Sequence, residues 1–191
     1  MTAREDAAGS GPSLTRRVAT RLLARPSRLY ELTDQFVVAA SAAETWRFFS
    51  AAENLPLITP PWLAFQTTMP EPIVIERDTL LEYTITWLGA PVRWRTRIID
   101  FTPPRQFIDL QIHGPYALWH HQHTFEPVPG GVLCQDRVLY QLPFGPLGRL
   151  THALVVRRQL LAIFRYRRQV IARELGWVRA AQDDVEIRAF R

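Results

Sequence analysis

Apolar and polar residues alternate through most of the chain between residues 63 and 142, with the period of β-strands that bury one face. After Gly89 the pattern is clearest, because apolar residues fill one face of the next strand and arginines fill the other. Proline and glycine pairs divide the remainder. The expected strands cover residues 81–87, 92–98, 106–113, 116–126 and 132–142. Their connections are too short for parallel crossovers, so we expect an antiparallel meander.

Two further elements precede this region. Residues 30–38 alternate loosely and predict a first strand. Ser41 is suited to cap a helix over residues 42–50, and Glu44 three residues later completes a capping box. Residues 55–62 contain three prolines, which predict a short broken helix that turns the chain back toward the sheet.

The apolar period becomes helical after Pro146. Apolar residues recur at intervals of three and four over residues 147–177, and Gly176 is a typical helix end. A helix of that length extends about 40 Å at 1.5 Å per residue. We therefore expect an α+β helix-grip fold, in which a curved antiparallel sheet of about seven strands wraps around a long C-terminal helix, with two short helices after the first strand. A cavity between helix and sheet follows from this shape.

Both ends of the chain lie outside this pattern. Residues 1–28 are predicted to be a flexible arginine-rich leader, with a surface helix that docks on lipid or on a partner as the alternative. Residues 178–191 mix charges without a period and predict a loose tail. The sequence thus predicts a leader over residues 1–28, one ligand-binding domain over 29–177, and a tail over 178–191.

Composition excludes several kinds of chemistry. All 23 basic residues are arginine, so Schiff-base chemistry, a pyridoxal anchor and a phosphate-loop lysine are ruled out. The net charge is +5, and arginines crowd the predicted C-terminal helix. We expect these arginines to be solvated, with weak contact to a membrane surface as an alternative, and we predict no nucleic-acid partner. Cys134 is the only cysteine, and it is expected to be buried and inert.

Several irregular motifs, taken in order, resemble the START-like SRPBCC superfamily, which has the helix-grip fold. The motifs are residues 54–62, 121–127, 130–131, 136–138 and 140–150. The resemblance covers residues 29–176 and points to a bacterial branch without an established activity. It implies the fold and a cavity for a hydrophobic ligand, and related members include polyketide cyclases, dehydratases and lipid-binding proteins. It does not imply one chemistry, because this scaffold carries many functions.

The candidate polar chemistry centres on a histidine cluster. Strand alternation places His121 and His123 on one face, although a slip of one residue would exchange them with His120 and Gln122. This spacing occurs in metal sites, but a site would need a third ligand, from Asp136 or His152. We instead expect hydrogen bonds from the histidines to Asp136 or Tyr140, and we predict no metal and no cofactor.

By resemblance to polyketide cyclases, four residues are candidates for acid–base catalysis: His121, His123, Asp136 and Tyr140. The alternative is a polar layer that positions the sheet against the helix. Glu82 and Asp109 lie in regular strands and would need partners if they were buried. Arg157 could supply one, or it could extend its head group to the edge of the sheet.

The apolar candidates outline a ligand cavity. They are Trp62, Tyr83, Trp87, Trp94, Trp119, Phe125, Leu154, Leu161 and Phe164. We expect the cavity to bind a small or medium hydrophobic molecule such as a lipid, quinone, polyketide or aromatic metabolite. The alternatives are a cyclase-like or dehydratase-like enzyme and a peripheral membrane or partner-docking protein. No apolar run is long enough to span a bilayer, and a chain with one cysteine fits a cytoplasmic location.

Overall fold

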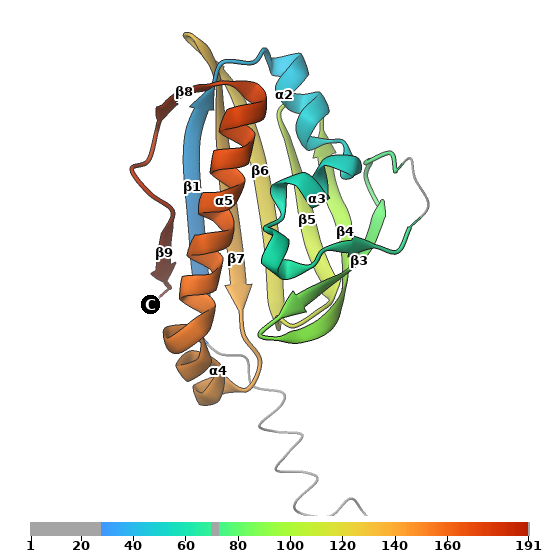
Figure 1. Ribbon diagram of the computed structural model, residues 1–191, viewed down its shortest axis with the longest axis vertical. Helices are drawn as coiled ribbons and strands as arrows, with labels where there is room; N and C mark the ends of the chain where they lie inside the picture. Colours follow the sequence, from blue (N-terminus) through green and yellow to red (C-terminus); the bar gives the residue numbers. More distant parts are fainter. Residues whose placement is uncertain (1–27, 70–72, 191) are drawn as a thin grey trace, which may run out of the picture.

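The computed structural model describes residues 28–69 and 73–190 of the chain. These residues form one antiparallel sheet with the strand order β2-β3-β4-β5-β6-β7-β1-β8, and β9 also pairs with β1 (Figure 1). The strands are β1 (Tyr30–Val38), β2 (Gln66–Thr67), β3 (Leu80–Trp87), β4 (Ala90–Thr102), β5 (Gln106–His113), β6 (Leu118–Val128), β7 (Gly131–Gln141), β8 (Trp177–Ala180) and β9 (Glu186–Ala189). The predicted meander is confirmed, and the described sheet has two strands more than expected.

Short helices follow β1 as predicted: α2 (Ala42–Phe49), η1 (Ala52–Asn54), α3 (Leu55–Ile58) and η2 (Pro61–Leu63). The capping box is present, because the Ser41 hydroxyl accepts from the Glu44 backbone N–H, and the Glu44 carboxylate accepts from the Ser41 backbone N–H. In Figure 1, α2 and α3 lie over the half of the sheet that contains β4 and β5.

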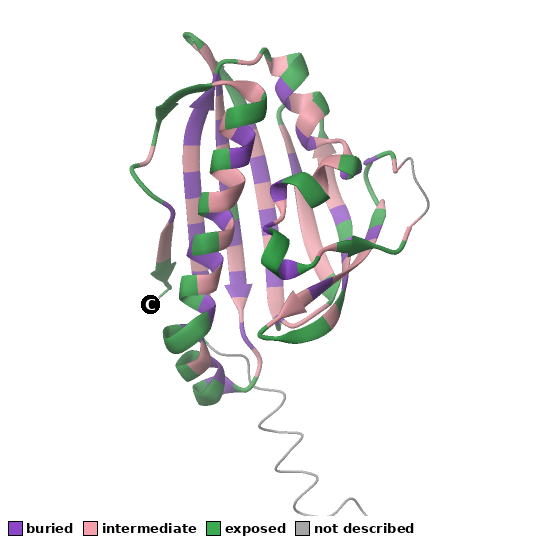
Figure 2. Ribbon diagram, in the orientation of Figure 1, coloured by how far each residue is buried: buried purple, intermediate pink, exposed green. Residues whose placement is uncertain are grey.

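The C-terminal helical segment has three parts: α4 (Gly145–Thr151), the π-helical turn η3 (His152–Val156) and α5 (Arg157–Leu175). The helix α5 lies over β1 and β7 and runs roughly along them (Figure 1), which confirms the predicted helix-grip arrangement. Buried residues alternate along the central strands and gather on the side of α5 that faces the sheet (Figure 2). None of the described helices is both long and apolar enough to cross a membrane.

The predicted loose tail is wrong for the described part of residues 178–191. After α5 the chain turns at Gly176, whose φ is +78°, and it returns along β1 as β8 and β9. Each strand is only four residues long, which is too short to give a clear alternating pattern in the sequence. They hydrogen-bond the edge of β1, which would otherwise be open. The leader predicted over residues 1–28 lies outside the described residues, except for Arg28.

Candidate functional site

A cavity of about 160 Å³ lies between the sheet and the helices α3 and α5. Its walls come from strands β3 to β6 and are mostly aromatic and aliphatic. Five of the predicted ligand contacts line it: Tyr83, Trp87, Trp94, Trp119 and Phe164. Its polar lining consists of Thr59, Thr96, Asp109, His121, His123 and Arg167. The cavity therefore has an apolar wall with one concentrated polar region.

The aromatic wall is a set of rings that contact one another. The Trp94 ring packs edge-on against Trp119, with 5.4 Å between centroids, and stacks on Tyr83 at 6.1 Å. The ring of Tyr116, a residue that the sequence did not suggest, has its centroid 4.8 Å from that of Trp119. Burial raises the pKa of the Tyr83 and Tyr116 phenols well above the usual range, so both stay protonated. These neutral rings present apolar faces to the cavity.

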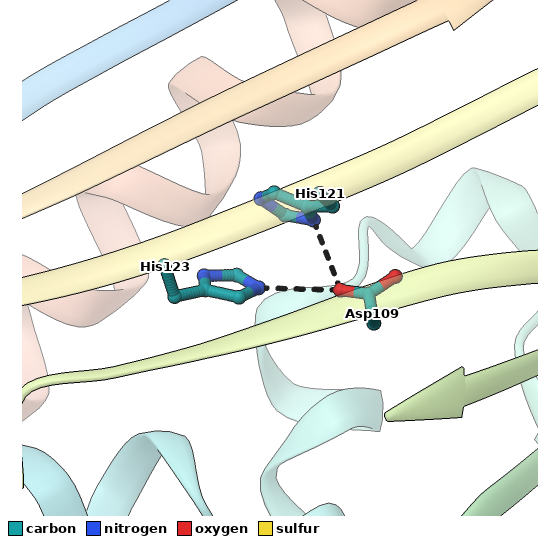
Figure 3. A group of neighbouring side chains, drawn as sticks. All are labelled: Asp109, His121 and His123. Atoms are coloured by element: carbon teal, nitrogen blue, oxygen red, sulfur yellow. Dashed lines mark ion pairs between the residues drawn. The ribbon is translucent and has the colours of Figure 1, made fainter. Parts of the chain in front are cut away.

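The polar region is built by strand pairing. His121 lies opposite Asp109 of β5, and His123 lies opposite Asp136 of β7. Paired residues on neighbouring strands share a face, so the predicted inward orientation of both histidines holds. Figure 3 shows the two rings converging on the Asp109 carboxylate. Asp109 Oδ2 lies 3.5 Å from His121 Nδ1 and 3.5 Å from His123 Nε2.

Asp136 lies behind the histidines, on the side away from Asp109. Its Oδ1 atom is 3.0 Å from His121 Nε2, in a hydrogen bond that we expected. The same oxygen is 2.6 Å from His123 Nδ1, although this nitrogen is out of line for a hydrogen bond. Burial acts to raise the pKa of Asp136, but His123, the contacts with both imidazoles and Arg167 hold it well below the usual range. Asp136 is therefore a buried carboxylate that orients two imidazoles.

The two histidines differ in their proton affinity. Burial lowers the pKa of His121, and the neighbouring charge of His123 lowers it further. Burial also acts to lower the pKa of His123, but Asp136 and Asp109 outweigh it and raise that pKa. The rings lie 3.8 Å apart between centroids, so a second positive charge would be repelled. Of the two rings, His123 therefore takes up a proton more readily than His121.

Two arginines of α5 turn toward the sheet, contrary to the expectation that the arginines of this helix are solvated. Arg167 lines the cavity, with its guanidinium 5.5 Å from the Phe164 ring centroid. Arg168 forms an ion pair with Asp34, whose side chain is 1% exposed. Arg157, the residue considered for such a pair, is exposed. A buried Arg–Asp pair thus forms from α5, but about three helical turns beyond Arg157, the residue that the sequence suggested.

Other predicted residues lie elsewhere. The Tyr140 hydroxyl is 2.8 Å from His152 Nε2, and this pair is in the core rather than in the cavity lining. Phe125 and Leu161 are also core residues. Trp62 and Leu154 are exposed and line a groove on the outside of the molecule. Cys134 is buried as expected, and burial raises its pKa.

The family described as "Polyketide cyclase / dehydrase and lipid transport" matches residues 38–163. No curated protein matches the chain in sequence. Among solved structures, the di-domain ARO/CYC StfQ from the steffimycin biosynthetic pathway is similar with a TM-score of 0.60 and 16% identity, over 84% of this chain and 53% of that one.

Two other similar structures are nearly covered by this chain. A START superfamily protein from Mycobacterium smegmatis has a TM-score of 0.57 and 14% identity, over 76% of this chain and 97% of that one. The ginseng major latex-like protein 151 from Panax ginseng has a TM-score of 0.55 and 10% identity, over 78% and 99%. At these identities the likeness concerns the fold. Because the family match spans most of the sequence, the chain belongs to the polyketide cyclase/dehydrase and lipid transport family of the START-like SRPBCC superfamily.

Proposed function

We propose that the protein binds a small or medium hydrophobic molecule of the lipid, quinone, polyketide or aromatic class in the cavity between the sheet and α5. The observation that carries the proposal is the cavity itself, about 160 Å³ with mainly aromatic and aliphatic walls. Ligand sites in proteins are typically apolar pockets with a few polar groups that fix orientation. The family, whose description includes lipid transport, supports the same class of function.

The size of the cavity favours an aromatic group over a long acyl chain. An apolar cavity of about 150 Å³ is known to hold one benzene molecule. The present cavity is close to that volume, so it accommodates one ring as it stands, and a two-ring molecule such as 1-naphthol would bind by displacing a side chain of the wall. His121, His123 and Arg167 would receive a hydroxyl or carbonyl oxygen on that ring, since all three line the cavity.

Calorimetric titration with phenol, 1-naphthol and menadione tests this proposal. Ile163 lines the cavity, whereas its neighbour Ala162 is exposed on the same helix. We expect Ile163→Trp to lower the affinity for the best of these probes at least tenfold by occupying the space, and Ala162→Trp to leave it unchanged. Equal affinities for the two variants would place the binding site elsewhere.

A second candidate function is a cyclase-like or dehydratase-like enzyme, and the histidine pair in the cavity wall favours it. A ring nitrogen of His121 or His123 could exchange a proton with a bound ketone or enol, while Asp136 holds both imidazoles in place. His121→Gln and His123→Gln separate the two functions when turnover of a polyketide-like substrate and ligand affinity are measured on the same samples. Lost turnover with retained affinity supports catalysis, and unaltered turnover excludes it.

A further inference from the structure

We propose that Asp109, His121 and His123 form a binding site for a single divalent transition-metal ion in the wall of the cavity. Each residue offers one ligand atom: Oδ2 of Asp109, Nδ1 of His121 and Nε2 of His123. The three atoms lie within 4.8 Å of one another. They come from adjacent strands, β5 and β6, whose register fixes their relative positions.

The separations fit a metal ion better than direct hydrogen bonds. Asp109 Oδ2 is 3.5 Å from each of the two ring nitrogens, which is beyond the usual range for a hydrogen bond. Zinc binds nitrogen and oxygen ligands at about 2.0–2.2 Å, which puts two ligands of one ion about 3.0–3.5 Å apart. Figure 3 shows both dashed contacts ending at the same carboxylate oxygen. The two ring nitrogens lie within 4.8 Å of each other, and an ion bound at this point would bring them to a similar separation of about 3.0–3.5 Å.

Asp136 contacts the ring nitrogen of each histidine that faces away from Asp109, and such a carboxylate contact is common for metal-binding histidines. Its Oδ1 atom contacts Nε2 of His121 at 3.0 Å and Nδ1 of His123 at 2.6 Å. The hydrogen bond to Asp136 puts the proton of a neutral His121 on Nε2, which leaves a free lone pair on Nδ1, and the Asp136 carboxylate beside Nδ1 of His123 favours a proton on that nitrogen in the same way. Both lone pairs then point toward the Asp109 carboxylate. Three acceptors converge with no donor between them, and a cation satisfies all three.

Local charge also permits a divalent ion. The carboxylates that face the cluster are Asp109 and Asp136, and the cation that faces it from α5 is Arg167. With both imidazoles neutral, these groups leave one excess negative charge. Asp34 and Arg168 neutralise each other beside the cluster.

Donor type and exposure indicate the kind of ion. Two imidazoles and one carboxylate suit Zn²⁺, Co²⁺ or Fe²⁺, whereas Mg²⁺ and Ca²⁺ prefer oxygen ligands. Three protein ligands leave coordination positions open, as in catalytic rather than structural metal sites. All three residues line the cavity, so an open position would face a bound ligand. The oxygen of a phenol or ketone could then bind the ion directly.

The test is a titration of untagged, EDTA-treated full-length protein with Co²⁺, followed by visible ligand-field absorption. We expect saturation at one ion per chain and displacement of the Co²⁺ by Zn²⁺. Asp109→Asn and His121→Gln should abolish the absorption. Asp136→Asn should weaken binding about 10- to 100-fold, because it removes only the group that orients the ligands.

His120→Gln is the matched control, because His120 directly precedes His121 in β6 and its side chain points to the opposite face of the sheet. It should bind Co²⁺ like the unaltered protein, and circular dichroism checks that every variant is folded. No saturable binding, or equal binding in folded Asp109→Asn, would overturn the metal site. This result is separable from the proposed ligand binding, because the EDTA-treated protein can be titrated with 1-naphthol in the same buffer.

Discussion

Filling the cavity should stabilise the protein while it removes ligand binding. An unfilled cavity costs about 24 cal/mol of stability per Å³, so about 160 Å³ amounts to about 4 kcal/mol if the space is dry. The indole of Ile163→Trp would occupy part of this space, and imperfect fit offsets part of the gain. We expect the free energy of unfolding to rise by about 1–2 kcal/mol. In a chain of this length, this corresponds to a rise in Tm of about 2–8 °C.

Urea unfolding and thermal unfolding, both followed by circular dichroism, measure this change without added ligand. Ala162→Trp adds the same indole at an exposed position of α5, and it should alter stability by no more than about 0.5 kcal/mol. A loss of more than 1 kcal/mol in Ile163→Trp, with unaltered affinity for 1-naphthol, would show that side chains already fill the space. The reasoning from cavity to ligand would then be refuted.

Three further predictions concern the framework around the cavity. Burial, with a smaller effect of the Arg157 charge, lowers the pKa of His152 to about 4. The free energy of unfolding should therefore fall by up to about 3 kcal/mol as the pH drops from about 6.5 to 4, because the unfolded chain takes up the proton first. Urea midpoints at pH 7 and pH 5 should differ less in His152→Phe than in the unaltered protein, and an equal difference would contradict the assignment. Asp34→Asn leaves the guanidinium of Arg168 buried without its charge partner. It should lower the free energy of unfolding in urea by about 3–5 kcal/mol, and a decrease below 1 kcal/mol would mean that water reaches the pair. Gly176→Ala should lower the free energy of unfolding by about 1–2 kcal/mol, because φ is +78° at this residue and the added Cβ would lie 3.1 Å from the Cβ of Ala39. Thermal unfolding measures this change, and an unchanged Tm would argue against this turn.

The elements that a regular period or a local cap defines could be predicted from the sequence. The alternation on both sides of Gly89 predicted the β3–β4 hairpin, and the capping box of Ser41 and Glu44 predicted the start of α2. The inward face of β6 was also predictable, because Trp119 and Phe125 share the alternation of His121 and His123. Local sequence carries this information, since side chains two apart on a strand share a face.

The parts that depend on distant segments could not be predicted. Asp109 meets the histidines through the β5–β6 register, which is set by both strands together. Arg168 is buried because Asp34 lies beneath α5, yet the two residues are 134 positions apart. β8 and β9 form because β1 offers an open edge, and strands of four residues are too short to show a clear period of their own. In each case the position of one segment depends on contact with another segment that is distant in the sequence.

The central claim is that the cavity between the sheet and α5 holds a hydrophobic ligand. Native mass spectrometry of the intact protein with 1-naphthol, and of the protein as purified, tests it most directly. The account predicts one bound molecule per chain, released into organic solvent and missing from folded Ile163→Trp but retained by Ala162→Trp. An unliganded mass in every sample, or the same bound mass in both variants, would contradict it.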